Sequence, residues 1–214
     1  MQRLRIRFSR GEELKFISHL DIMRLWQRTL HRAGIPLAYT EGFSPHPRIS
    51  LAAPLAVGVT SQGELMDIFC SKWVSPHFFT NAVNRQLPPG IQILQVYSVA
   101  PTVPSLQSQV GYAEYKVELD TERDKQGIEA ALISLLSVKH LPWHHERDTG
   151  TRNYDLRALI DDLWLIEWRS GYCTIGMRLR CDSGGSGRPE QVAAALGFSH
   201  PHSTHRTKLI LKTS

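Results

Sequence analysis

The residues best suited to chemistry lie in a proline-rich stretch, YTEGFSPHPRISLAAPLAVG, which runs from Tyr39 to Gly58. Pro45 and Pro47 have a fixed φ and disfavour helical conformations of the residues before them. The stretch is therefore expected to be a stiff loop that presents Phe43 and His46 and loses little entropy on binding. Such rings stack on unpaired bases, which favours RNA contact; the alternative is that Phe43 packs into the core.

Basic residues are concentrated around this loop. The first 48 residues hold nine Arg or Lys and four Asp or Glu, out of 25 basic and 20 acidic residues in the chain, so their excess equals the net charge of +5. A local basic face is typical of proteins that bind a polyanion, although it also suits a solvated surface. The predicted nucleic-acid contacts are Arg5, Arg7, Arg24, Arg28, Arg32, Phe43, His46 and Arg48.

Three histidines are the candidates for catalysis. An imidazole of His19, His31 or His46 could take the proton of an RNA 2′-hydroxyl, as in metal-free RNA cleavage. Helix capping, a basic face and a turn explain the same residues without catalysis. The sequence has no helical HxxxH and no paired cysteines, so no metal site is predicted.

The elements that position these residues follow from hydrophobic periodicity. Residues 3–8 alternate as a strand whose arginines form a basic outer face, and a helix follows from Ser18 to Gly34. Strands are expected at 35–39, 48–55 and 63–70, then a helix capped by Ser75 and a strand at 91–99. This β-α-β-β-(β)-α-β order, in which the bracketed strand is additional, predicts an α+β, ferredoxin-like sandwich with helices on one face of an antiparallel sheet.

The second half repeats this pattern in outline. We expect an N-terminal ferredoxin-like domain over 1–99, a proline-containing linker over 100–111, and a more divergent ferredoxin-like domain over 112–214, in tandem. The three cysteines are scattered, and no apolar run approaches the ~18–20 residues needed to cross a bilayer. The N-terminus lacks the apolar segment of a signal peptide, so a cytoplasmic protein with no membrane partner is expected.

Three segments together resemble a known family. They are KFISHLDIMRLWQRTLHRAGIPLAYTEGFSPHPRISLAAPLAVGV, AEY at Ala113 to Tyr115, and YDLRALI at Tyr154 to Ile160. They are similar to the bacterial radical-SAM-associated domain of unknown function, and the similarity is closest in the first half. The resemblance implies an accessory module, fused to a radical SAM protein or encoded beside one, in a context of RNA and ribosome metabolism.

The chain itself lacks the CxxxCxxC that holds a radical SAM iron–sulfur cluster. S-adenosylmethionine and the cluster are therefore expected on the partner only, with no cofactor in this chain. The predicted function is a non-catalytic module that binds RNA or presents substrate. One alternative is a metal-independent endoribonuclease resembling CRISPR-RNA-processing enzymes, although LGFSHPHSTH (Leu196 to His205) has a single glycine where those carry a glycine-rich loop. The other alternative is a protein-interaction module that docks on the partner enzyme.

Overall fold

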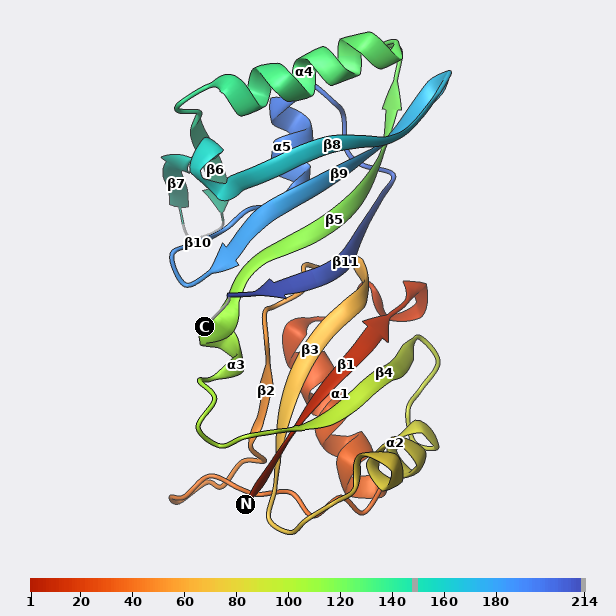
Figure 1. Cartoon of the computed structure of the whole chain (residues 1–214), viewed down its shortest axis with the longest axis vertical. Coiled ribbons are helices and arrows are strands. Elements are labelled where there is room, and N and C mark those ends of the chain that lie inside the picture. The colour runs from red at the N-terminus through yellow and green to blue at the C-terminus, as the bar shows by residue number, and fades with distance from the viewer. Residues whose placement is uncertain (148–149, 213–214) are drawn as a thin grey trace. The chain divides into compact units, whose positions relative to one another are not determined.

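The computed structural model describes residues 1–147 and 150–212 (Figure 1). Contacts divide the chain into two units. Unit 1 comprises Met1–Val110 with the C-terminal residues from Leu211, and unit 2 comprises Gly111–Ile210. Within the described ranges, no helix combines the length and the apolar character that a membrane span requires.

Unit 1 has the predicted ferredoxin-like order of elements. Its sheet runs β2–β3–β1–β4, and each neighbouring pair is antiparallel. The α+β class is thereby confirmed. The elements are β1 (Gln2–Arg10), a short 3-10 turn (Glu12–Leu14), α1 (His19–Arg32), β2 (Ile49–Leu51), β3 (Thr60–Cys70), α2 (Pro76–Asn84), β4 (Ile91–Val99) and α3 (Leu106–Gln109).

Local sequence signals explain where the two long helices of unit 1 begin. The Ser18 hydroxyl accepts a hydrogen bond from the Asp21 amide and caps α1. Ser75 caps α2 in the same way through the Phe78 amide, and Pro76 occupies the first helical position, where no amide hydrogen is needed. Both starts agree with the sequence prediction.

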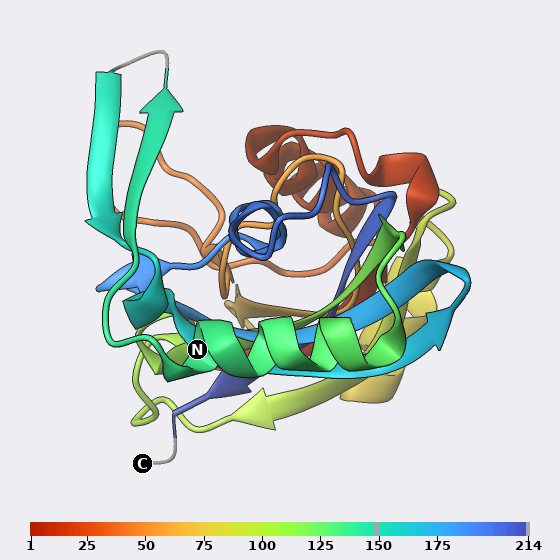
Figure 2. The same ribbon diagram turned by 90° about the horizontal axis from the view of Figure 1, so that it is seen from above.

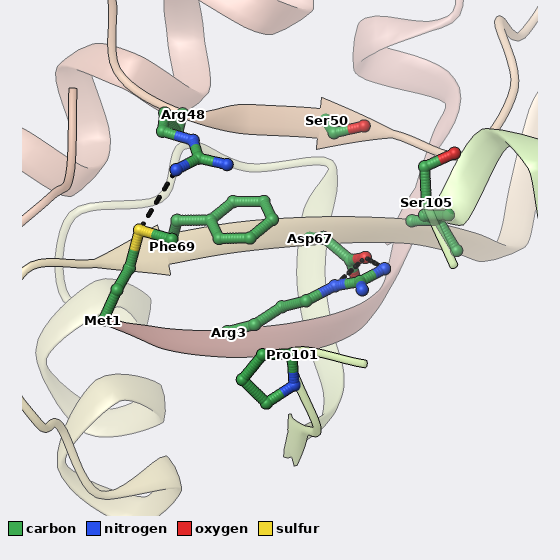
Figure 3. A pocket seen from close by; sticks show the side chains of 9 residues that line it. Met1, Arg3, Arg48, Ser50, Asp67, Phe69, Pro101 and Ser105 are labelled. Atoms are coloured by element: carbon green, nitrogen blue, oxygen red, sulfur yellow. Dashed lines mark hydrogen bonds and ion pairs between the residues drawn. The ribbon is translucent and has the colours of Figure 1, made fainter. Parts of the chain in front are cut away.

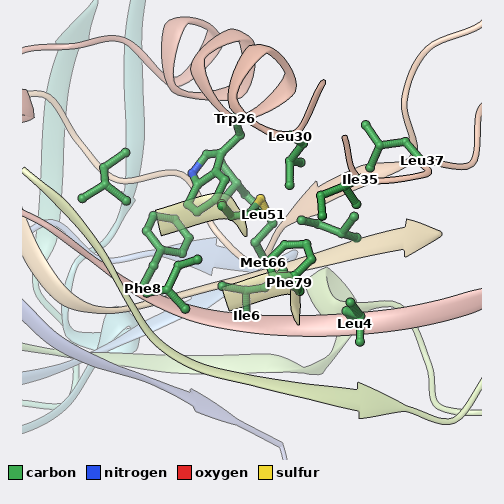
Figure 4. Packing of buried hydrophobic residues seen from close by; sticks show 14 of the residues in the cluster. Leu4, Ile6, Phe8, Trp26, Leu30, Ile35, Leu37, Leu51, Met66 and Phe79 are labelled. Carbon is green, nitrogen blue, oxygen red and sulfur yellow. The ribbon is translucent and has the colours of Figure 1, made fainter. Parts of the chain in front are cut away.

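The core of unit 1 lies between the helices and one face of the sheet (Figure 4). Leu4, Ile6 and Phe8 alternate along β1 and are fully buried. Trp26 of α1 lies over them, with its ring centroid 5.0 Å from that of Phe8 in an edge-to-face arrangement. The inward face of β1 is therefore fixed, and its odd-numbered residues lie on the opposite face of the sheet.

The segment between α1 and β3 departs from the prediction. Residues 35–39 do not form a strand; they make isolated bridges from Leu37 to Cys70 and from Tyr39 to Pro47. The strand expected over 48–55 is limited to β2, because proline cannot donate a ladder hydrogen bond and Pro54 follows closely. β3 begins three residues earlier than expected.

Of residues 100–111, expected to be a linker, all but Gly111 belong to unit 1. They include α3, and Leu106 and Val110 are each 1% exposed. The boundary between the two units falls after Val110. The division into domains at 1–99 and 112–214 stays a prediction, as does their tandem arrangement.

Unit 2 has the same strand order, β8–β9–β5–β11. In Figure 2, α4 lies along these strands, and the β6–β7 hairpin projects away from them. β8 and β9 pair antiparallel on either side of Ser170 and form a hairpin. The elements are β5 (Val110–Thr121), α4 (Lys125–Ser137), β6 (Pro142–Arg147), β7 (Gly150–Asp155), a 3-10 turn (Arg157–Leu159), β8 (Ile160–Arg169), β9 (Gly171–Asp182), β10 (Gly185–Ser186), α5 (Pro189–Ala195) and β11 (Ser203–Leu211).

Candidate functional site

The outer face of β1 is not the solvent-exposed basic face that the sequence predicted. Arg3 and Arg5 do lie opposite the core, but they are only 5% and 4% exposed. Residues 100–109 cover them. Alternation along the strand showed which side chains share a face, but it could not show what covers that face.

A buried carboxylate explains how two guanidiniums remain charged there. Asp67 of β3 accepts hydrogen bonds from Arg3 Nε and Nη2 at 2.7 and 2.5 Å, and from Arg5 Nε and Nη2 at 2.8 and 3.1 Å. Burial alone would lower the pKa of Arg5, but the hydrogen bonds and charge of Asp67 outweigh it and raise that pKa.

The remaining donors of these two arginines hold the covering segment. Arg3 Nη1 and Nη2 donate to the carbonyls of Val103 and Pro104 at 2.7 and 2.9 Å. Arg5 Nη1 donates to Gln109 Oε1 at 2.9 Å. The placement of Arg5 on an exposed binding face is therefore corrected: its guanidinium is buried and binds Gln109 of the covering segment.

A pocket of about 300 Å³ opens on this same face (Figure 3). Phe69 lies in its wall between two guanidiniums, with Arg48 Cζ 4.4 Å and Arg3 Cζ 5.8 Å from the ring centroid. Arg48 Nη1 lies 3.1 Å from Met1 Sδ. Arg48 is half-buried, so its charge borders both the pocket and solvent.

The proline-rich loop next to Arg48 has a hydrogen-bonded base. The Thr40 amide donates to the His46 carbonyl at 2.9 Å, and the His46 amide donates to Thr40 Oγ1 at 3.0 Å. Further from the tip, the Arg48 amide joins the two sides of the loop by donating to the Ala38 carbonyl at 2.8 Å. Phe43 is fully exposed beyond this base, so the alternative that it packs into the core is wrong.

The polar face of α1 carries the other predicted basic residues. Arg24, Arg28 and Arg32 follow one another at four-residue steps and are all exposed. Arg24 Nη1 makes a 3.3 Å surface contact with Asp21 Oδ1, and Arg32 Nη2 donates to the Gln86 carbonyl at 3.2 Å. These contacts leave most of the guanidinium donors of α1 facing solvent.

A groove of about 700 Å³ runs beside this helix. Asp21, Leu25, Arg28 and Arg32 line it at spacings of four, three and four residues, so they form one stripe of α1. The other lining residues are Phe16, Ile17, Ser18 and Pro88.

The structure thus distributes the predicted contacts over separate places. Arg28 and Arg32 share the α1 groove, and Arg24 lies beside it. Phe43, His46 and Arg48 belong to the loop and its base. Arg7 is exposed on the sheet face opposite the helices, because it alternates with the core residues of β1.

The catalytic candidates are not brought together. His19 begins α1 and His31 lies in its last turn, twelve residues later, which separates them by about 18 Å along the axis. His46 is in the proline-rich loop. In residues 1–147 and 150–212, no group of three or more His, Cys, Asp or Glu side chains could hold a metal ion.

Sequence reasoning missed Asp67 and Phe16. A signal for Asp67 was present, because it sits between apolar Met66 and Ile68 in a strand and so must share the outer face. Phe16 has no comparable signal. An aromatic residue just before a helix cap usually packs inward, yet Phe16 is 73% exposed at the groove.

Comparisons with known proteins give a family and a fold. A family described as "uncharacterized protein conserved in bacteria (DUF2344)" matches residues 3–189. No curated protein matches the chain. Among solved structures, a chain of a Cbf5–Nop10–Gar1 complex is similar with a TM-score of 0.52 at 10% identity, over 97% of this chain and 48% of that one.

A second similar structure is described as an H/ACA RNP bound to a substrate RNA containing 2′-deoxyuridine. Its TM-score is 0.47 at 10% identity, over 97% of this chain and 47% of the other. The chain thus spans about half the length of these two solved chains. At these identities the likeness to the Cbf5-containing structure shows the fold alone.

Proposed function

Because the match covers most of its length, the chain belongs to this uncharacterized bacterial family, DUF2344, and we propose that unit 1 is an RNA-binding module. In this proposal it is non-catalytic and presents RNA to a radical SAM enzyme. The RNA contacts are the arginines of α1 and the tip of the proline-rich loop.

The observation that carries the proposal is the row of arginines on α1. Arg24, Arg28 and Arg32 recur at four-residue steps, about 6 Å apart along the axis, beside an open groove. The acidic partner of Arg24 is an exposed Asp21 at 3.3 Å, and such surface pairs contribute little and exchange readily. Cations arranged in this way can follow a phosphate backbone without a large rearrangement.

The proline-rich loop supports the same proposal. Its base is closed by backbone hydrogen bonds, and Phe43 is fully exposed at its tip. An aromatic ring held in water by a restrained loop loses little entropy when a base stacks on it. Base stacking would therefore give the Phe43 ring a contact that it does not make within the protein core.

The radical SAM partner is the finer part of the proposal and rests on the resemblance of the three sequence segments. The chain's cysteines, Cys70, Cys173 and Cys181, are buried and lack the spacing of the cluster motif. We therefore assign the iron–sulfur cluster and S-adenosylmethionine to the partner. The separation of His19 from His31 gives the endoribonuclease alternative no support.

The test measures binding of a labelled, mixed-sequence 12-mer RNA by fluorescence anisotropy. Wild type is compared with the triple variant Arg24→Gln, Arg28→Gln, Arg32→Gln. The control replaces three exposed lysines of unit 2, Lys116, Lys125 and Lys139, by Gln, and so removes the same charge elsewhere.

The expected effect follows from counterion release. Each phosphate contact on a single strand contributes about 0.7 to the slope of log affinity against log salt, so three contacts contribute about 2. Taking about 1 M salt as the reference, the triple variant should lose about 500-fold in affinity at 50 mM salt and about 30-fold at 200 mM. The control should change affinity by less than tenfold at either salt concentration.

Phe43→Ser should weaken the same RNA by about 5- to 150-fold without changing the salt slope, because stacking releases no counterions. Equal losses in the α1 variant and the lysine control would show that only net charge matters and would contradict the proposed site. No binding at 50 mM salt would exclude the RNA module and favour a surface that docks on the partner enzyme.

A further inference from the structure

The groove beside α1 is built on a restrained turn. Arg10, buried at the end of β1, donates to the carbonyls of Leu14, Lys15 and Ile17. The Gly58 amide donates to the Lys15 carbonyl at 2.7 Å from the other side. The backbone that places Phe16 and Ser18 at the groove is therefore held at several points.

Asp21 supplies a hydrogen-bond acceptor at one end of the groove. Its Oδ2 accepts from the Ser18 hydroxyl at 2.7 Å, and its Oδ1 contacts Arg24 Nη1 at 3.3 Å. The Ser18 hydrogen bond, followed by Arg24 and the charge of Arg28, lowers the pKa of Asp21. The carboxylate is ionised at neutral pH, accepts only, and has about two of its four lone-pair positions free.

Phe16 supplies a flat apolar surface at the same groove. Its ring is 73% exposed, and Lys15 Nζ lies 5.2 Å from the ring centroid. Stacking of a planar base on the ring would cover apolar surface that unit 1 leaves in water.

Cations lie at the other end of the groove. Arg28 and Arg32 are seven and eleven residues beyond Asp21 on the same stripe, about 10 and 16 Å along the helix axis. The Arg28 side chain is exposed, and its charge is one of those that lower the pKa of Asp21. The groove therefore has an acceptor end and an anion-binding end, joined by an apolar wall.

We propose that this groove holds one unpaired nucleotide of the bound RNA and selects guanine, with the base on Phe16, its Watson–Crick edge on Asp21, and its phosphate at Arg28 and Arg32. This inference rests on the proposed RNA-binding function and adds the identity of the base. The volume of about 700 Å³ is within the usual range for small-ligand sites.

The choice of base follows from the donors that each base presents. Guanine offers N1–H and N2–H side by side, which match the two oxygens of one carboxylate. Adenine and cytosine place a ring-nitrogen acceptor beside their amino group, and uracil places carbonyls on both sides of its single N–H. A carboxylate repels these acceptors, so the same site discriminates against all three.

The experiment uses labelled octamers 5′-UUUXUUUU, where X is guanosine, inosine or adenosine, with the whole 214-residue chain. Wild type should bind the guanine octamer about 5- to 150-fold more tightly than the adenine octamer, as expected for one bidentate contact. Inosine keeps N1–H and lacks the 2-amino group, so its octamer should lie between the two.

Asp21→Asn should bring the guanine and adenine octamers to less than about fivefold of each other. The matched control is Asp124→Asn, an exposed aspartate at the start of α4, where it is the N-cap and the Gly127 amide donates to it. This control should retain the guanine preference.

Three results would overturn the inference, and they differ in what they say of RNA binding. If all three octamers bind equally and binding still depends on Arg24, Arg28 and Arg32, the RNA module stands and guanine selection is wrong. If no octamer binds wild type at 50 mM salt, both proposals fail. A guanine preference that survives Asp21→Asn would place the recognition elsewhere and also contradict this site.

Discussion

Replacing Asp67 by asparagine removes a carboxylate that faces two buried guanidiniums. Asp67, Arg3 and Arg5 are 1%, 5% and 4% exposed, and the four contacts between them are 2.5–3.1 Å long. Asparagine keeps the shape of the side chain but offers one carbonyl oxygen, and its amide N–H₂ faces guanidinium donors. Two positive charges then remain buried without an opposite charge between them.

The cost can be estimated from the burial of the group. Removing one partner of a buried ion pair costs about 3–5 kcal/mol, because the remaining charge is neither solvated nor paired. The hydrogen bond that asparagine retains offsets about 1 kcal/mol at most. A loss of about 2–4 kcal/mol is therefore expected, out of a total stability of about 5–15 kcal/mol for a typical domain.

Urea unfolding followed by tryptophan fluorescence measures this loss. With a denaturant dependence of about 1–3 kcal/mol per M, a loss of about 2–4 kcal/mol should lower the unfolding midpoint of Asp67→Asn by about 1–4 M. Glu41→Gln is the control, because Glu41 is exposed in the proline-rich loop and its change should stay within about 0.5 kcal/mol.

A triple variant separates charge from packing. Arg3→Met, Arg5→Met and Asp67→Leu together leave no buried charge at this place, and apolar replacement of buried ion pairs is often neutral or stabilising. The triple variant should therefore be more stable than Asp67→Asn alone. A loss below about 1 kcal/mol for Asp67→Asn would refute the reasoning, since the guanidiniums would then have found solvent or another partner.

Two further predictions concern a buried hydroxyl and a capping carboxylate. Thr29 is fully buried, and in the described chain its Oγ1 has no hydrogen-bond partner. Thr29→Val should therefore raise the free energy of unfolding, measured by urea titration, by about 1 kcal/mol. A decrease would contradict this prediction. Hydrogen bonds from the Leu141 amide, then from His140 and the Arg157 amide, lower the pKa of Asp155 in the folded protein. The contribution of ionised Asp155 to the free energy of unfolding is therefore fully present above its unfolded pKa of about 4, and it is lost as pH falls through the lower folded pKa. The difference in unfolding free energy between wild type and Asp155→Asn should therefore shrink below about pH 4, and a constant difference from pH 6 to pH 2 would contradict this explanation.

Elements with local signals could be predicted from the sequence. The start of α1 follows from Ser18 and Asp21, and its buried face follows from the spacing of Ile22, Trp26 and Leu30. β4 has the predicted bounds, Ile91–Val99, because apolar alternation identifies a strand without knowledge of its partners. Signals of this kind depend on residues that lie close together in the sequence.

The burial of Arg3 and Arg5 could not be predicted in this way. It depends on Asp67, more than 60 residues away, and on the covering segment near residue 105, about 100 residues away. That segment is proline-rich and aperiodic, which made it look like a linker. The segment is held in place because the arginines that it buries donate hydrogen bonds to it.

The candidate site could be predicted in part from the sequence. The stiff loop was predicted from its prolines, and Phe43 is exposed as expected. The α1 groove was not visible, because Phe16 and Pro88 reach the helix stripe only through the turn after β1 and the turn before β4. The concentration of basic residues indicated that α1 could be a binding surface. The groove beside α1 follows only from the tertiary structure.

The position of β1 in the sheet has a consequence for biosynthesis. β1 is made first, but it pairs with β3 and β4, which end at Cys70 and Val99. At about 5–20 residues per second, a ribosome needs roughly 5–20 s to reach the end of β4 after completing β1. During that interval Leu4, Ile6 and Phe8 have no sheet to cover them, so the nascent chain should depend on chaperones until β4 has emerged.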